Sequence, residues 1–290
     1  MAQRYAGKQL IGRPDGRRLR TTPSGERLPP MLVRTRTEAQ EHYRESIEIS
    51  AAAAWLDGKA REGFDGIGMA HLAAAAFVRT AARLPYINRF VAGHRLFARE
   101  ELDVLLSGIG ETYSSDVKAR LDGSDTVADV YYKLLRAFDD FRSGDRDRAA
   151  ERVTDFLMLL PRFLLRFGIQ IMRLLDYFGL LSRRVLFASP WHASLRLFDN
   201  APAGLAANAM PLSDLGSTSV NITLGAMRST LEPDDGGHLV PRRWLDVDIA
   251  VDSRIATKAQ IEKAILYWKH YMAEPHELER APRRVLDDDN

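Results

Sequence analysis

The stretch Leu245-Asp-Val-Asp-Ile-Ala-Val-Asp-Ser-Arg-Ile-Ala-Thr-Lys258 joins a strand to the start of a helix. Apolar residues alternate with aspartates in its first half, which is the period of a strand with one buried face. Thr257 with Gln260 fits a capping box, and apolar residues then recur at helical spacing as far as Met272. The sequence therefore predicts a half-buried strand that leads directly into an amphipathic helix.

This stretch resembles the closing motif of the chloramphenicol acetyltransferase and dihydrolipoamide acyltransferase superfamily, in which a strand ends in D-H-R-x-x-D-G or H-H-x-x-x-D-G. Asp252 and Arg254 match that motif. Ser253 stands at the position of the catalytic histidine, and Thr257-Lys258 replaces the Asp-Gly pair. An isolated hydroxyl does not accept a proton near neutral pH. The resemblance thus implies the family's fold without its usual acid–base chemistry.

Further segments resemble the same superfamily and occur in the same order. They are an opening strand within 34–49 with His42-Tyr43 at its H-F position, a helix and hairpin over 69–97, a strand bracketed by Pro190-Trp191 and Asp199-Asn200, and a closing Pro275 with Leu278. The bracketed strand would supply the hydroxyl that stabilises an oxyanion. The chain is most similar to a stand-alone bacterial subgroup described as 2-oxo acid dehydrogenase acyltransferase-like.

The resemblance implies an α/β fold of two layers, in which helices cover a mixed sheet. It also implies a homotrimer, because the superfamily builds its active site between subunits. We expect the trimer contact at a sheet edge that includes Ser217–Met227, since this stretch alternates as a strand and matches the family's interface strand.

Composition agrees with one large domain of ordinary globular type. The chain has 290 residues, of which 46% are hydrophobic, and it contains no cysteine, which excludes disulfides, a thiol nucleophile and a cysteine-ligated metal. It has no apolar run of about 20 residues and no recognisable cleavable signal, so we expect a cytoplasmic protein. The net charge of +2 gives no general reason to expect nucleic acid as a partner.

Residues 1–36 read as a basic, flexible N-terminal arm, with residues 37–290 forming the acyltransferase-like domain. The arm carries nine Lys or Arg residues and only two acids, and its prolines break any periodicity. It either lies on the body of the domain or docks on a neighbouring subunit. Tyr5 is its only aromatic residue, which argues against base stacking and therefore against nucleic acid binding.

A helical insertion at about 125–184 distinguishes this chain from simpler family members. The stretch 127–181 reads as helical almost throughout, with a solvated turn from Asp139 to Asp147. If the apolar second half is helical, Arg162, Arg166 and Arg173 lie within about 40° of one another and form one narrow basic stripe.

Three settings suit an apolar helix with such a stripe. The helix could be sandwiched within a core or a trimer, it could lie in a membrane surface, or it could form a lid whose arginines bind an anionic ligand. The absence of lysine-rich flanks and the presence of Asp176 near the stripe argue against the membrane.

His192, in Ser-Pro-Trp-His, is the candidate for a substitute base, because the resemblance places it beside the oxyanion strand. Its alternative is a buried structural histidine. The histidines show no metal-ligand spacing with a carboxylate, so we expect no metal. The glycine-containing stretch 204–225 lacks a phosphate-loop motif.

Three functions follow. The first is an acyltransferase relative, a candidate pseudoenzyme, that binds an acyl thioester such as acyl-CoA and has no other expected cofactor. Its candidate ligand-binding residues are Arg162, Arg166, Arg173 and Arg254. The alternative is a non-catalytic scaffold or regulatory subunit that partners a true acyltransferase homologue. The third is an active acyltransferase with a relocated base, for which His192 is the candidate.

Overall fold

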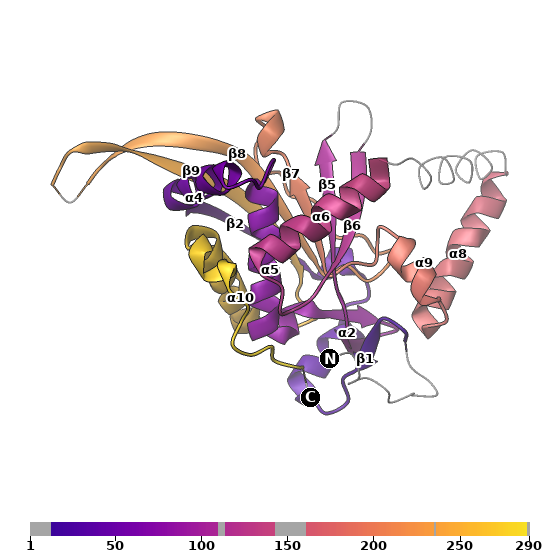
Figure 1. The fold of residues 1–290 in the computed structure, drawn as a ribbon. Helices are drawn as coiled ribbons and strands as arrows, with labels where there is room; N and C mark the ends of the chain where they lie inside the picture. Colours follow the sequence, from indigo (N-terminus) through magenta and orange to yellow (C-terminus); the bar gives the residue numbers. More distant parts are fainter. Residues whose placement is uncertain (1–12, 110–113, 143–160, 235, 289–290) are drawn as a thin grey trace.

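A computed structural model describes residues 13–109, 114–142, 161–234 and 236–288. Its centre is a six-stranded mixed sheet (Figure 1). The strand order is β2 (Gln40–Glu48), β9 (Leu239–Asp252), β8 (Val220–Pro233), β7 (Leu195–Asp199), β5 (Leu102–Ile109) and β6 (Ser114–Leu121). The β5–β7 and β7–β8 pairs are parallel and the other pairs are antiparallel. The mixed sheet expected from the sequence is confirmed.

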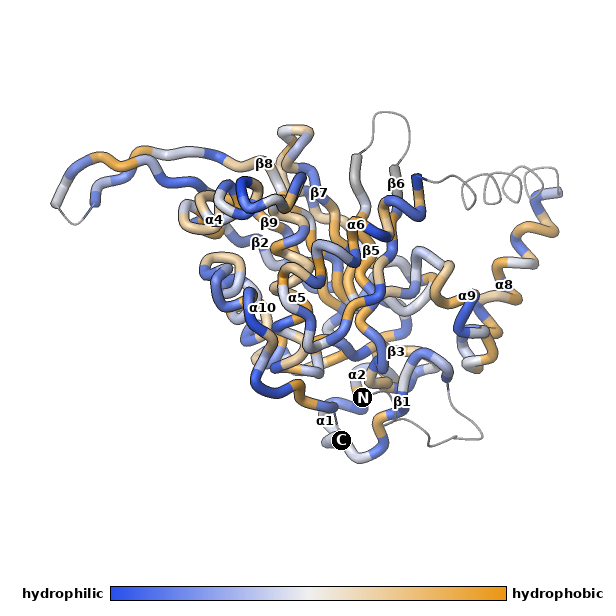
Figure 2. The backbone as a smooth tube through the Cα atoms, in the orientation of Figure 1, coloured by the Kyte–Doolittle hydropathy of each residue, from blue (hydrophilic) through white to orange (hydrophobic). Residues whose placement is uncertain are grey.

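Helices cover one face of this sheet, and the apolar core lies between the two layers (Figures 1 and 2). They are α4 (Ser50–Arg61), α5 (Met69–Arg83), α6 (Val127–Arg142) and α10 (Lys258–Ala273). The alanines of α5 let it sit close to its neighbours, since small side chains shorten the distance between packed elements. Ala73 has no exposed surface, and its carbonyl accepts a hydrogen bond of 3.1 Å from the Trp268 indole of α10.

The described part of the N-terminal arm lies on the body of the domain. Strand β1 (Gly16–Arg18) adds to the hairpin of β3 (Arg89–Ala92) and β4 (Arg95–Arg99), which makes a second, three-stranded sheet. Short helices follow: α1 (Ser24–Arg27), α2 (Pro29–Leu32) and α3 (Arg36–Ala39), with the 3₁₀ helix η1 (Pro85–Asn88) before β3. Residues 13–36 therefore follow the first of the two expected alternatives, in which the arm lies on the body of the domain. Residues 1–12 lie outside the described residues.

Strand β8 is an inner strand, which corrects the expected sheet edge at Ser217–Met227. Its first part pairs with β7 on one side and β9 on the other. Pairing with β7 ends at Leu224, because β7 itself ends at Asp199. Beyond a bulge, β8 pairs with β9 alone, and the two form a hairpin that extends away from the body (Figure 1). Among the described residues, β8 therefore has an edge without a strand partner only along this hairpin.

The stretch predicted as a helical insertion contains α6 and α8 (Arg162–Phe178), and it ends at the start of α9 (Arg183–Ala188). Helix α8 stands apart from the sheet (Figure 1). Asp139 and Asp140 belong to the last turn of α6, so the predicted turn at these two residues is wrong; residues 143–160 lie outside the described residues. The 3₁₀ helices η2 (Ala201–Ala203) and η3 (Pro275–Glu279) complete the fold. Among the described helices, none is long and apolar enough to cross a membrane.

Candidate ligand-binding site

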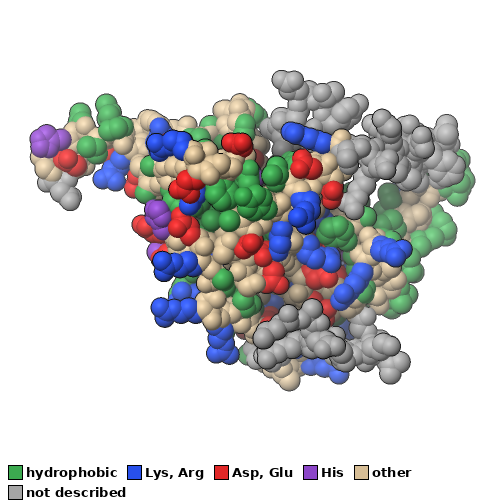
Figure 3. Space-filling view, viewed as in Figure 1, with side chains coloured by type: hydrophobic (Ala, Val, Ile, Leu, Met, Phe, Trp, Pro, Cys, Tyr) green, Lys and Arg blue, Asp and Glu red, His purple; other side chains and the backbone are tan. Residues whose placement is uncertain are grey.

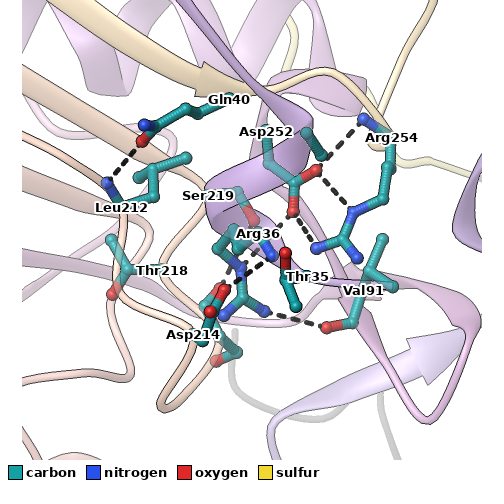
Figure 4. A network of polar contacts seen from close by, with 12 residues as sticks. Thr35, Arg36, Gln40, Val91, Leu212, Asp214, Thr218, Ser219, Asp252 and Arg254 are labelled. Atoms are coloured by element: carbon teal, nitrogen blue, oxygen red, sulfur yellow. Dashed lines mark hydrogen bonds and ion pairs between the residues drawn. The ribbon is translucent and has the colours of Figure 1, made fainter. Parts of the chain in front are cut away.

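The motif strand β9 ends at Asp252, whose side chain has no exposed surface. Its carboxylate accepts two hydrogen bonds of 2.8 Å from the Arg254 guanidinium, and Arg36 Nε lies 3.4 Å from Asp252 Oδ2 (Figure 4). Both arginine side chains are almost completely buried, so one carboxylate faces two buried guanidinium groups. Burial lowers the pKa of Arg36, and the charge of Asp252 opposes that shift.

Backbone carbonyls accept hydrogen bonds from the terminal nitrogens of both guanidinium groups. Arg254 Nη1 donates to the carbonyls of Val33 and Arg34, and Arg36 donates to those of Ser213 and Val91. Buried charges need such partners because desolvation of a lone ion is costly. This cluster of Arg36, Asp252 and Arg254 therefore joins the N-terminal segment, the β3 strand and the 205–219 loop at one place.

Asp214 fixes the 205–219 loop beside this cluster. Its carboxylate accepts hydrogen bonds from the backbone N–H groups of Arg36, at 2.7 Å, and Thr37, at 3.0 Å. Gln40 Oε1 accepts from the backbone of Leu212 in the same loop (Figure 4). The first turn of α3 is thus held by a carboxylate from a segment 177 residues away.

Ser253 and Thr257, which the sequence resemblance aligns with the family's histidine and aspartate, both have partners in the chain. Ser253 Oγ donates a 2.6 Å hydrogen bond to the carbonyl of Ala39. Thr257 caps α10, and its backbone N–H donates to Gln260 Oε1 at 2.8 Å. The predicted capping box is confirmed, while the absence of family chemistry at these two positions stays a prediction.

His192 is a poor fit to the predicted substitute base. Its side chain is 3% exposed, with Nδ1 2.8 Å from Ser189 Oγ and Nε2 3.2 Å from Asp176 Oδ1. Burial lowers the pKa of His192, although Asp176 opposes that shift. A general base needs a free ring nitrogen that reaches the substrate. Since both nitrogens are engaged, the geometry favours the structural alternative, in which His192 helps to hold α8.

Asp176 is the anchor of α8 on the body. Arg13 Nη2 lies 2.7 Å from its carboxylate, and Arg13 itself is held by Asp15 at 2.8 Å. Burial alone would raise the pKa of Asp176, but the hydrogen bond from His192 and the charge of Arg13 lower it to about 2. Sequence reasoning missed this contact because its partners are 163 residues apart and no local pattern links them.

The β3–β4 turn closes against the end of α8. Gly93 and His94 have φ values of 55° and 58°, which is the two-residue turn that suits a tight hairpin. A Cβ on Gly93 would lie 2.8 Å from the carbonyl oxygen of Tyr177, so glycine permits this close approach. The ring centroids of His94 and Tyr177 are 6.0 Å apart, edge to face.

A cavity of about 310 Å³ lies between this turn, the cluster and α8. Its walls contain four arginines and two aspartates, together with apolar and backbone surface: Arg34, Thr35, Arg36, Val91, Ala92, Gly93, His94, Arg173, Asp176, Tyr177, Asp214, Leu215, Gly216 and Arg254. Both aspartates are already hydrogen-bonded. The guanidinium groups of Arg34 and Arg173 make no hydrogen bond or ion pair with the described part of the chain. Two arginines whose side chains have no partner in the described part of the chain therefore line this cavity.

No family model matches the sequence, and no curated protein sequence is significantly similar to it. Solved structures are similar in fold. A probable dihydrolipoamide acetyltransferase from Listeria monocytogenes 4b F2365 has a TM-score of 0.56 and 9% identity, covering 87% of this chain and 89% of its own. The cubic core of the pyruvate dehydrogenase multienzyme complex has a TM-score of 0.56 and 11% identity over 88% of each chain. Chloramphenicol acetyltransferase has a TM-score of 0.50 and 10% identity, covering 86% of this chain and 94% of its own.

The chain has the chloramphenicol acetyltransferase-like fold. These identities are too low to carry more than the fold. In this acyltransferase fold, the cluster around Asp252 occupies the end of the motif strand, and the cavity opens beside it.

The three arginines of the predicted stripe on α8 have different surroundings in the structure. Arg173 lines the cavity, whereas Arg162 and Arg166 are exposed and lie away from its walls. Arg254 is in the wall, but its guanidinium is engaged by Asp252. Arg34 was not among the sequence candidates, because it lies in the segment interpreted as an arm.

Proposed function

We propose that this chain is an acyltransferase relative that binds an anionic acyl thioester, such as acyl-CoA, in the cavity beside Arg34 and Arg173. The supporting observation is that Arg34 and Arg173, which line this cavity, have no side-chain partner in the described part of the chain. Guanidinium binds phosphate through charge-assisted, often paired hydrogen bonds. A volume of about 310 Å³ is at the lower end of the usual range for small-molecule sites, enough for part of such a ligand.

In this proposal the ligand is held without the family's acid–base catalysis. Ser253 is bonded to a backbone carbonyl, Thr257 caps a helix, and His192 has both ring nitrogens engaged. Removing a general base costs about 10²- to 10⁴-fold in rate. We therefore expect binding with little or no acyl transfer.

The second candidate is a scaffold or regulatory subunit that partners a true acyltransferase homologue. It is favoured by the same three engaged side chains, which leave no free base at the motif. The two candidates differ in one property, because only the first needs an acyl thioester in the cavity.

Arg173→Ala should weaken acetyl-CoA binding by about 10- to 100-fold, because a hydrogen bond to a charged group contributes about 1.5–3 kcal/mol. Isothermal titration calorimetry measures this change. The melting temperature without ligand should stay nearly constant, since Arg173 is exposed and makes no ion pair with a described residue. Arg166→Ala is the matched control on the same helix and should bind like the unmodified protein. Absence of acetyl-CoA binding by the unmodified protein would support the scaffold candidate instead.

We also propose a homotrimer, as the resemblance implies. One protein of similar fold forms the cubic core of a multienzyme complex. In this chain the outer part of β8, in the extended hairpin, pairs with no described strand on its other side, and this edge could pair with a neighbouring subunit. Light scattering at micromolar concentration should give three times the mass of the chain, and a stable monomer would contradict a site shared between subunits.

A further inference from the structure

Helix α8 presents a large apolar face that no described part of the chain covers. None of its residues is buried, and Phe163, Phe167, Leu174 and Phe178 are 70%, 63%, 57% and 64% exposed. At 100° per residue these four side chains fall within an arc of about 60°. Figure 3 shows hydrophobic side chains gathered over this part of the molecule. Such a contiguous patch marks an interaction surface.

The apolar arc points away from the domain. Asp176, which is bound to Arg13 and His192, marks the side of α8 that faces the body. On a helix it lies about 170° from the centre of the apolar arc. The anchor therefore holds the helix with its aromatic side chains outward, where they cannot fold back onto the sheet.

The arginine stripe flanks this arc on one side. Arg162, Arg166 and Arg173 lie about 90° to 130° from the centre of the apolar arc, and Arg184 follows as an exposed residue of α9. Asp176 is the only acidic residue of α8, and it is turned inward. Of the two sequence-based objections to a membrane surface, the inward ion pair of Asp176 removes the one that rested on this residue; the absence of lysine-rich flanks is the other.

We propose that α8 docks parallel to the surface of a bilayer that contains anionic lipids. Phenylalanine and leucine would enter the boundary of the acyl chains, and Arg162 and Arg166, which lie away from the cavity, would reach the lipid phosphates. An uncovered apolar arc beside basic side chains without acidic partners complements an apolar surface bordered by phosphates. A protein surface would need its own carboxylates at the same spacing.

The test uses the full chain with two kinds of vesicle, one of phosphatidylcholine alone and one that also contains about 30% phosphatidylglycerol. The second composition gives a clear negative surface potential. Co-sedimentation should show binding to the anionic vesicles and much weaker binding to the neutral ones. The double variant Phe167→Asp, Leu174→Asp should bind anionic vesicles about 100-fold or more weakly. Two apolar side chains that the membrane would bury are lost, and two negative charges take their place. Leu266→Asp, at an equally exposed leucine of α10, is the matched control and should bind normally.

The arginines have a separate readout. Arg162→Ala with Arg166→Ala should lower binding to anionic vesicles by about 30-fold, because each basic residue near such a surface contributes roughly fivefold. Neither residue lines the cavity, so acetyl-CoA binding should not change. Inorganic phosphate should not compete with the vesicles if the apolar arc contributes to docking.

Two results would overturn the proposal. One is equal sedimentation of the Phe167→Asp, Leu174→Asp variant and the unmodified protein. The other is a combination of two observations: the unmodified protein binds no vesicles, and the Phe167→Asp, Leu174→Asp variant has a smaller mass in light scattering. That combination would assign the apolar face of α8 to contacts between copies of this chain.

Discussion

Asp252→Asn is expected to lower the free energy of unfolding by about 3–5 kcal/mol. The carboxylate is fully buried and faces the guanidinium groups of Arg254 and Arg36, which are 3% and 4% exposed. Asparagine keeps the shape but removes the negative charge, so two neighbouring buried cations lose their common counter-ion. This loss is a large part of the about 5–15 kcal/mol that stabilises a typical domain.

Urea unfolding measures this effect, with Asp246→Asn as the matched control on the same strand. Asp246 also pairs with an arginine, Arg228, but their side chains are 43% and 47% exposed. An exposed pair contributes at most about 1 kcal/mol. Similar losses for the two variants would mean that the cluster does not stabilise the fold through its charge.

Asp176→Asn is expected to detach α8 from the body at a cost of about 2 kcal/mol. The helix has no buried residue of its own, and the ion pair with Arg13 and the hydrogen bond with His192 hold it in place. Hydrogen exchange or limited proteolysis within α8 should accelerate about 30-fold at neutral pH, which is the same free energy expressed as a ratio. Glu48→Gln, which removes a half-exposed ion pair with Arg242, should leave α8 protected.

The pH dependence of this anchor has a defined sign. The pKa of Asp176 in the folded protein is about 2, below the ordinary aspartate value of about 4. The anchor therefore contributes its full stability above pH 4 and loses it as the pH falls from about 4 to about 2. In Asp176→Asn the protection of α8 should not change over this window. Acid-dependent release in that variant would assign the titration to another group.

Detachment of α8 should also affect the cavity, because Arg173 and Tyr177 form one of its walls. We therefore expect Asp176→Asn to weaken acetyl-CoA binding while the apolar arc stays available to a membrane. The same helix would then serve two surfaces, one turned to a ligand and one turned to lipid, with Asp176 deciding its orientation.

Local patterns in the sequence identified most of the elements around the motif. The stretch after Leu245 gave the correct strand, cap and helix, because alternation and the Thr257–Gln260 capping box depend on near neighbours alone. The helix and hairpin predicted over 69–97 are observed as α5, which begins at Met69, followed by β3 and β4. The boundaries that failed, at Asp139 and Asp140, lie where a polar helix end and a turn have the same composition.

The site depended on contacts that no local pattern records. Arg34 and Arg36 lie in a segment whose charge and prolines indicated a flexible arm. In the structure Arg36 pairs with Asp252, and both arginines line the cavity beside it. Arg173 was a candidate from its helical spacing, but only the packing of α8 separated it from Arg162 and Arg166. His192 was singled out by its neighbours in sequence, and its burial beside Asp176 favours the structural alternative.

The sequence by itself determined the strand, cap and helix of the closing motif, the resemblance to the acyltransferases and the alignment of Ser253 and Thr257 that this resemblance implies, because each depends on residue identity and short spacing. Only the tertiary structure decided which charges are buried together, which arginines remain unengaged and which face of α8 is exposed. The physical reason is that ion pairing and burial act between segments more than 150 residues apart, such as Arg13 and Asp176, whose proximity exists only after the sheet and its loops have closed.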